Sequence, residues 1–266
     1  LGSHFVDQGI GVLCQGLGVY GHLYKRSGLQ DREALDIAIS KSHNVVKEAA
    51  LDLLEIEDDW NEFLSTVEAK EAGKLEVSPP QVGDKIPTDL VLNCVISNKF
   101  SNTNDGSTAS HETSATMDAV PSGKTSRTIS LADILVSTPK NSELAAAGCH
   151  VVVVTFGVMS GAERWRLETA CPFPYYTDPS HALYQLLGLK RSVASVWNTA
   201  TLSYYGAQIA KGIPLPESYT DIEDDPHQMG GDFILDKQSK LQFVYRSKVP
   251  NDRPSVDLIL TALKGN

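Results

Sequence analysis

The chain has 266 residues, of which 41% are hydrophobic and 21% charged, so it can bury a sizeable core. The longest apolar run, at residues 148–157, is about half of what spans a bilayer, so we expect no transmembrane helix. The first residues lack the basic and apolar regions of a secretory signal, which predicts a cytoplasmic protein. The formal net charge of −10 argues against binding to nucleic acid or an anionic membrane, because such binding needs a basic surface.

The four cysteines do not form a recognisable metal or disulfide pattern. Cys14, Cys94, Cys149 and Cys171 are at least 22 residues apart, and none lies in a Cys-x-x-Cys motif. This spacing excludes a small disulfide scaffold and a four-thiolate zinc site of normal spacing. We therefore expect reduced thiols, no metal site and no cofactor.

The acidity of the chain is concentrated near its beginning. Residues 31–76 hold 13 carboxylates against five lysines and arginines, and their apolar residues recur at helical spacing. An unbroken helix of this length would be about 70 Å long, so we predict two helices, the second restarting near Asp58-Asp59. The carboxylates could bind a metal or a basic partner, but a solvated outer helix face is favoured.

A long polar stretch separates two β-like segments, at residues 90–96 and 129–135. Between them, in residues 99–127, 11 of 29 residues are Ser or Thr and Phe100 is the one aromatic residue. Such a stretch buries too little apolar surface to offset its ordering entropy, which predicts a disordered insertion.

From Cys149 onward, β and α signals alternate. The β-branched run at residues 151–156 predicts a strand buried on both faces. The segments that follow are a helix at 161–170, a strand at 173–177, a helix at 180–188, an irregular stretch, a hairpin of strands 232–235 and 241–245, and a helix at 254–264. A parallel strand pair, an antiparallel hairpin and a closing helix make up most of a thioredoxin-type fold.

Four stretches carry a family resemblance: VVVVTFG (151–157), CPFPYYTDPSHALYQLLGLKRSV (171–193), DDPHQMGGDFILD (224–236) and SKVPNDRPSV (247–256). Together they resemble the AhpC/TSA-type, peroxiredoxin-like 2 family, especially its fungal branch. The resemblance implies an α/β, thioredoxin-like three-layer sandwich at residues 81–266, preceded by a helical extension at 1–80. It also implies reduction of peroxides or disulfides by a thiol, with thioredoxin or glutathione as reductant. In the family's prostaglandin-metabolising branch the substrate is a lipid endoperoxide.

The chain departs from the family pattern where the reactive thiol should lie. The family places this thiol in a strand–Cys-x-x-Cys/Ser–helix segment, which should follow the element at 129–135. Only residues 136–148 are present there, whereas a strand, a helix and their turns need about 30 residues. We therefore infer that the expected segment is missing between Lys140 and Asn141. Cys171 and Cys14 remain as catalytic candidates, although neither has the adjacent basic residue or helix N-terminus that activates a thiol, and each also fits a structural role.

The predicted topology indicates where a ligand would bind, because parallel strands end at a shared edge of the sheet. The binding candidates at this edge are Thr155, Phe156, Asp178, Gly230, Gly231 and Arg253. Arg253 could hold a thiolate, a peroxide or a carboxylate by paired hydrogen bonds, or else form an ion pair with Asp252 or Asp257. Asp178, which precedes Pro179, is favoured as a helix N-cap over an acid or base.

Two further patterns are weak. The run at residues 221–225 followed by His227 could bind a cation, but an acidic surface loop is favoured. Gly16, Gly18 and Gly21 formally match a dinucleotide-binding pattern, yet no convincing strand precedes them.

We adopt the hypothesis of a peroxiredoxin-like thiol oxidoreductase whose Cys-x-x-Cys-type segment is absent from the sequence. One alternative is a non-catalytic thioredoxin-fold protein that binds a small molecule or a protein partner. Another is a metabolite-tailoring enzyme on the same scaffold without thiol chemistry. Loss of the central strand would expose a sheet edge, which we expect the helices at 31–76, the segment at 90–96 or a second subunit of a homodimer to cover.

Overall fold

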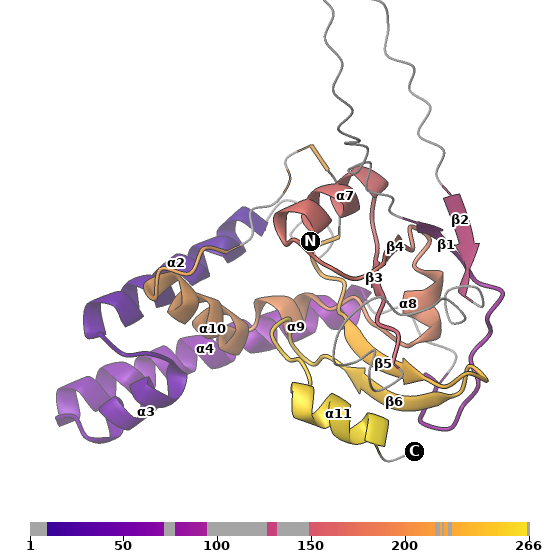
Figure 1. Ribbon diagram of the computed structural model, residues 1–266. Helices are drawn as coiled ribbons and strands as arrows, with labels where there is room; N and C mark the ends of the chain where they lie inside the picture. Colours follow the sequence, from indigo (N-terminus) through magenta and orange to yellow (C-terminus); the bar gives the residue numbers. More distant parts are fainter. Residues whose placement is uncertain are drawn as a thin grey trace, which may run out of the picture. The chain divides into compact units, whose positions relative to one another are not determined.

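The computed structural model describes residues 10–71, 78–94, 127–131, 149–215, 219, 221–222 and 225–264 (Figure 1). The chain divides into a terminal unit, Leu1–Ile86 with Ala182–Asn266, and a central unit, Pro87–His181. The predicted insertion at 99–127 lies outside the described residues except for the backbone of Arg127. The predicted break between Lys140 and Asn141 lies outside them too. In the described part of the chain, no helix is long and apolar enough to cross a membrane.

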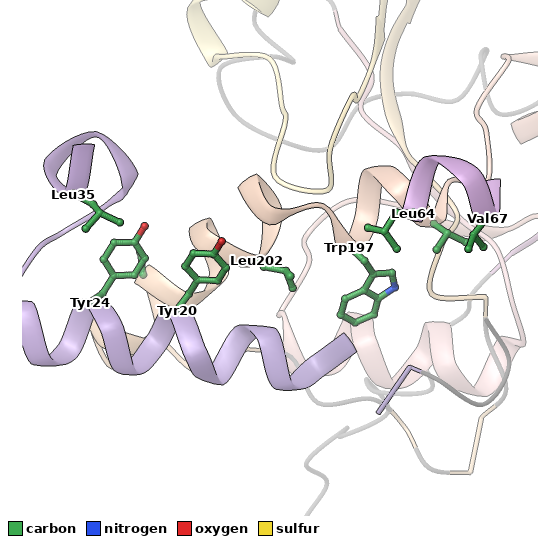
Figure 2. Close-up of a cluster of buried hydrophobic side chains, with 9 residues drawn as sticks. Tyr20, Tyr24, Leu35, Leu64, Val67, Trp197 and Leu202 are labelled. Carbon is green, nitrogen blue, oxygen red and sulfur yellow. The ribbon is translucent and has the colours of Figure 1, made fainter. Parts of the chain in front are cut away.

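Both segments of the terminal unit contribute helices to its core. Its N-terminal helices are α2 (Ile10–Ser27), α3 (Arg32–Ser40) and α4 (Asn44–Glu71), and they share a core with α9 (Val193–Trp197) and α10 (Thr199–Ala210). Figure 2 shows the side chains of this core, which comprises Tyr20, Tyr24, Leu35, Leu64, Val67, Val193, Trp197, Leu202 and Ala207. Burial of one large apolar side chain of this kind contributes about 1.5 to 3 kcal/mol.

The acidic region forms two helices as predicted, but the predicted restart near Asp58-Asp59 is wrong. The break between α3 and α4 is at residues 41–43, where the hydroxyl of Ser42 donates a hydrogen bond to a carbonyl at the end of α3. Helix α4 continues through residues 58–59 because tertiary contacts hold it there, among them the bond from Trp60 Nε1 to the carbonyl of Trp197 at 2.8 Å. These contacts outweigh the local capping signal.

Three helices were missed by sequence reasoning, and two of them, α2 and α10, pack against each other. The glycine-rich stretch near the N-terminus forms α2, and the stretch predicted to be irregular after residue 188 contains α9 and α10. Tyr24 of α2 and Ser203 of α10 join their hydroxyls in a buried hydrogen bond of 2.5 Å. Glycine lowers helix propensity, so the packing of α2 on α10 has to stabilise α2.

The C-terminal part of the terminal unit has the predicted hairpin. Strands β5 (Gly231–Leu235) and β6 (Leu241–Arg246) pair antiparallel, with a register shift between Ile234 and Leu235. The carboxylate of Asp236 closes the hairpin loop by accepting hydrogen bonds from the backbone N–H groups of Gln238 and Lys240. Helix α11 (Val256–Lys264) packs on β6, and the short α8 (Ala182–Leu186) lies earlier in the chain.

The central unit is built on a mixed four-stranded sheet of order β2-β1-β4-β3. Its elements are β1 (Val91–Cys94), β2 (Arg127–Ser130), β3 (Val153–Thr155), α7 (Met159–Glu168) and β4 (Tyr175–Thr177). Strands β3 and β4 are parallel, as predicted, with Thr155 opposite Thr177. Strand β3 is half-buried, so the prediction of burial on both faces is wrong.

Of the three elements proposed to cover the sheet edge, the segment at 90–96 pairs with one strand of the parallel pair, while β3 ends the sheet among the described residues. Strand β1, from the predicted segment at 90–96, pairs antiparallel with β4 on the side away from β3. The hairpin of β5 and β6 forms a sheet of its own among the described residues. The structure is thus mixed α/β with N-terminal helices and a small mixed sheet, while the three-layer sandwich and the boundary between residues 80 and 81 stay predictions.

Candidate functional site

The parallel strands of the central unit bring three predicted site residues together. Thr155 ends β3 and Phe156 follows it, while Asp178 follows the end of β4. The backbone N–H of Asp178 donates to the carbonyl of Thr155 at 2.7 Å, which fixes the two strand ends side by side. The ring of Phe156 lies 5.2 Å from that of His181, measured between ring centroids. The C-terminal ends of β3 and β4 therefore share one edge, as the topology predicts.

Asp178 is a buried carboxylate in a tight turn. It is 1% exposed, and its Oδ1 accepts a hydrogen bond from the hydroxyl of Ser180 at 3.1 Å. The N–H of His181 donates to the carbonyl of Asp178, and His181 has a positive φ of 57°. The neighbouring Thr177 is fully buried, and its hydroxyl has no hydrogen-bond partner among the described residues. This edge thus presents buried polar groups, whereas the role of Asp178 as a helix N-cap stays a prediction.

In the terminal unit, the side chain of Arg253 lies against the backbone of Gly230. A Cβ added to Gly230 would lie 3.1 Å from Nη2 and 3.2 Å from Nη1 of Arg253. At Gly231, an added Cβ would lie 2.6 Å from the carbonyl oxygen of Tyr245 across the hairpin. The N–H of Ser247 donates to the carbonyl of Gly230 at 3.1 Å, and the buried hydroxyl of Ser247 has no partner in the described part of the chain. An added Cβ would thus collide with backbone at Gly231, whereas at Gly230 it would crowd the end of the Arg253 side chain. The approach of a ligand to these two glycines stays a prediction.

The ion pair of Arg253 differs from the local one considered from the sequence. Its Nη1 lies 3.5 Å from Oδ2 of Asp232 in β5, not beside a carboxylate of Asp252 or Asp257. Asp252 instead accepts hydrogen bonds from the hydroxyl of Tyr245 and from the backbone N–H of Lys248. The bond from Tyr245 is the largest of the effects that lower the pKa of Asp252. Arg253 thus forms its ion pair with a carboxylate that is distant in sequence.

The six predicted binding residues fall into two groups that the structure describes separately. Thr155, Phe156 and Asp178 belong to the central unit, and Gly230, Gly231 and Arg253 belong to the terminal unit. Within each group the residues lie together, as expected. The single edge formed by all six stays a prediction.

The described thiols are free and half-buried. Cys171 follows the C-terminal end of α7, where its N–H donates to the carbonyl of Arg166, and it packs against the cluster of Ala162 and Tyr175. This is the opposite end of a helix from the one at which reactive thiolates are found. Burial raises the pKa of the Cys149 thiol. The side chain of the other catalytic candidate, Cys14, lies outside the described residues, although its backbone belongs to α2.

A buried histidine was underrated from the sequence. His227 is 1% exposed, and its Nδ1 lies 3.1 Å from Oδ1 of Asp225, which also pairs with Nε of Arg191 at 2.7 Å. Burial alone would raise the pKa of Asp225, but the N–H of His227 and the charge of Arg191 hold it below its ordinary value. The acidic run at 221–225 thus contributes a structural carboxylate. Within the described ranges, no three His, Cys, Asp or Glu residues gather as metal ligands.

Comparison with known proteins identifies a family domain in the chain. Residues 135–249 match the family model described as AhpC/TSA antioxidant enzyme, which implies a thioredoxin-like fold for this part. The match covers less than half of the chain; it includes Cys171, Asp178 and Gly230, and it excludes Cys14 and Arg253. No curated protein and no solved structure shows a significant match. The match gives no support to the fungal branch.

Proposed function

We propose that this protein is a peroxiredoxin-like thiol oxidoreductase of the peroxiredoxin-like 2 kind, which reduces a peroxide or a disulfide. The observation that carries the proposal is the AhpC/TSA antioxidant match over residues 135–249. The parallel pair of β3 and β4 and the hairpin of β5 and β6 lie within this range and agree with a thioredoxin-like domain. Assignment to the fungal branch would rest on the sequence resemblance alone.

The proposed reaction is a two-electron reduction of the peroxide. A thiolate attacks one peroxide oxygen, the O–O bond breaks, and a proton converts the leaving oxygen into an alcohol or water. The cysteine is left as a sulfenic acid, which a second thiol converts into a disulfide with release of water. Thioredoxin or glutathione then supplies two electrons and two protons to restore the thiols.

The thiol that starts this reaction has two possible origins. One is the Cys-x-x-Cys-type segment that the resemblance places near residues 140–141 and that this sequence does not contain. The other is Cys171 or Cys14, of which Cys171 alone falls within the family match. An intact-mass measurement on the natural protein distinguishes the two, because the missing segment would add about 30 residues.

The remaining residues have binding roles in this proposal. Arg253, supported by Gly230, would hold the anionic part of a substrate or the thiolate. Thr155, Phe156 and Asp178 would line the same edge of a three-layer sandwich formed by residues 81–266. Two disulfide crosslinks test this arrangement: a pair of cysteines placed at positions 156 and 253 should join if the edge is shared, and a pair at positions 52 and 253 should not.

The activity test is peroxide-dependent oxidation of a reductant. Purified protein is given hydrogen peroxide with either thioredoxin and its reductase or glutathione and its reductase, and NADPH consumption is followed. We expect turnover with one of the two reductants and loss of turnover in Cys171→Ser or Cys14→Ser, whichever removes the reactive thiol. Turnover that survives in both single variants and in the double variant would exclude these two thiols from the mechanism.

One observation favours a second candidate, a non-catalytic protein that binds a small molecule or a partner. Burial raises the pKa of Cys149, and Cys171 lies at a helix C-terminus, so neither has the surroundings of a reactive thiolate. In that case the same assay would give no NADPH consumption with either reductant. Ligand binding at Arg253 would still be measurable.

A further inference from the structure

The guanidinium of Arg253 contacts the backbone of Gly230 and is still partly exposed to solvent. Its side chain is 54% exposed, and its two terminal nitrogens lie over Gly230, where a Cβ would come within 3.1 to 3.2 Å of them. The glycine backbone and the carboxylate of Asp232 therefore both contact this guanidinium from within the chain. A guanidinium held in this way loses less freedom when it binds an anion, which favours binding.

Within the described residues, the ion pair of this guanidinium is formed with a loosely held carboxylate. Nη1 of Arg253 lies 3.5 Å from Oδ2 of Asp232, whose side chain is 37% exposed. Charge-assisted hydrogen bonds are normally about 2.7 to 2.9 Å long, and an arginine has five N–H donors. The ion pair with Asp232 therefore leaves most of the donors of Arg253 available to a ligand.

A residue with a buried hydroxyl binds the backbone of Gly230. Ser247 donates its backbone N–H to the carbonyl of Gly230, and its hydroxyl is buried without a partner among the described residues.

We propose that Arg253 and Gly230 bind the carboxylate group of a small organic acid, and that Asp232 occupies this position until the acid displaces it. The planar fork of a guanidinium matches a carboxylate, and Asp232 presents that same group from within the chain. A neutral peroxide would gain much less from this cation. The inference rests on the proposed function only in naming the substrate class, an organic acid that carries the reducible group, because binding itself requires no reactive thiol.

The test compares benzoate with benzamide, which has nearly the same shape but no charge. Each is titrated into the full chain while the Nε–Hε signal of Arg253 is followed by NMR and the heat is followed by calorimetry. We expect saturable binding of benzoate with a shift of the Arg253 signal, and no saturable binding of benzamide. Equal binding of the two compounds, or binding without a shift at Arg253, would overturn the proposal.

Variants separate the carboxylate site from general charge effects. Arg253→Gln should weaken benzoate binding about tenfold or more, and Arg253→Lys should fall between this variant and the native protein. Asp232→Asn should bind benzoate about fivefold more tightly, because the internal competitor is gone. Weaker binding by Asp232→Asn would show that Asp232 positions Arg253 and does not compete with the ligand, and this would refute the displacement.

Matched controls come from elsewhere in the chain. Arg164, whose side chain is 51% exposed and paired with Glu168, is the control for loss of an exposed arginine, so Arg164→Gln should leave benzoate binding unchanged. Gly230→Ala should weaken binding, whereas Gly18→Ala should not, because nothing lies within 4 Å of a Cβ at Gly18. Benzoate binding without any peroxide turnover would support the site and reject the redox function. Peroxide turnover without benzoate binding would support the redox function and reject the carboxylate site.

Discussion

The backbone of Gly206 in α10 lies so close to Tyr20 in α2 that a Cβ on Gly206 would be 2.4 Å from the Cβ of Tyr20. The same added atom would lie 2.9 Å from the backbone nitrogen of Gly21. Neither neighbour is the end of a flexible side chain, so neither can rotate out of the way. The contact between α2 and α10 therefore requires a glycine at position 206.

Gly206→Ala should lower the free energy of unfolding by about 1 to 3 kcal/mol. The alanine would push α2 away from α10, which weakens the packing of Tyr20 and Tyr24 in the shared core. Urea unfolding followed by circular dichroism measures the change.

Gly18→Ala in α2 is the matched control, because nothing lies within 4 Å of a Cβ at that position. Its expected effect is a gain of about 0.5 to 1 kcal/mol from the higher helix propensity of alanine. Equal effects of the two substitutions would show that α2 and α10 do not cross as closely as described.

A buried network at the α2–α4 contact predicts a loss of stability at alkaline pH. The hydroxyl of Tyr20 donates to Oε1 of Glu57 at 2.5 Å, and Nη1 of Arg32 lies 2.6 Å from the same oxygen. Burial first, and then the bond to Glu57, raises the pKa of Tyr20 well above its ordinary value. A raised pKa in the folded state means that this stability is complete below about pH 10 and is lost as the pH rises further.

The measurement is the free energy of unfolding at pH 8, 10 and 11 for the native protein and for Tyr20→Phe. At pH 8 the variant should lose about 1 kcal/mol, the typical worth of a hydrogen bond. Above pH 10 the native protein should lose stability more steeply than the variant, so that the two curves converge. Tyr204→Phe, which alters a tyrosine that is 42% exposed, should keep the native slope; parallel curves for native protein and Tyr20→Phe would contradict the prediction.

Local sequence signals were sufficient where a segment makes its own structure. The β-branched run at 151–156 led to β3, and the parallel pairing with β4 followed from the helix between them. The hairpin was predicted within one residue, because Asp236 closes its loop with bonds to Gln238 and Lys240. The family match over residues 135–249 agrees with the resemblance that these segments carry.

Local sequence signals failed where contacts with residues distant in sequence determine the structure. Helix α2 contains Gly16, Gly18 and Gly21, which argue against a helix until α10 packs on it. The site shows the same effect: Arg253 pairs with Asp232, 21 residues away, while the adjacent Asp252 accepts a hydrogen bond from Tyr245. A local sequence pattern cannot indicate contacts between residues that are distant in sequence.

The pairing of Asp225 predicts a loss of stability in acid. The N–H of His227 and the charge of Arg191 together outweigh burial and lower the pKa of Asp225. A lowered pKa in the folded state gives stability that is complete above about pH 4 and is lost as the pH falls through the folded-state value. Asp225→Asn should therefore cost about 1 to 2 kcal/mol at pH 7 and nothing near pH 2.

Urea unfolding at pH 7, 4 and 2 measures this difference, with Asp52→Asn as the control. Asp52 is exposed on α4, so its substitution should change stability by less than about 0.5 kcal/mol at every pH. A cost for Asp225→Asn that stays constant down to pH 2 would mean that its carboxylate is not the group that responds to acid.

The burial of Cys149 predicts that its thiol reacts slowly with an alkylating reagent. Burial raises its pKa, so at pH 8 less of it is thiolate than in an ordinary cysteine of pKa about 8.5, and the thiolate is the form that reacts. Brief treatment with iodoacetamide, followed by mass spectrometry of the peptides, should label Cys149 several times more slowly in the folded protein than in urea. The folded-state rate should keep rising above pH 9. Labelling of folded Cys149 at pH 7 that is as fast as in urea would contradict this, and it would make Cys149 a candidate for the reactive thiol that the sequence does not place.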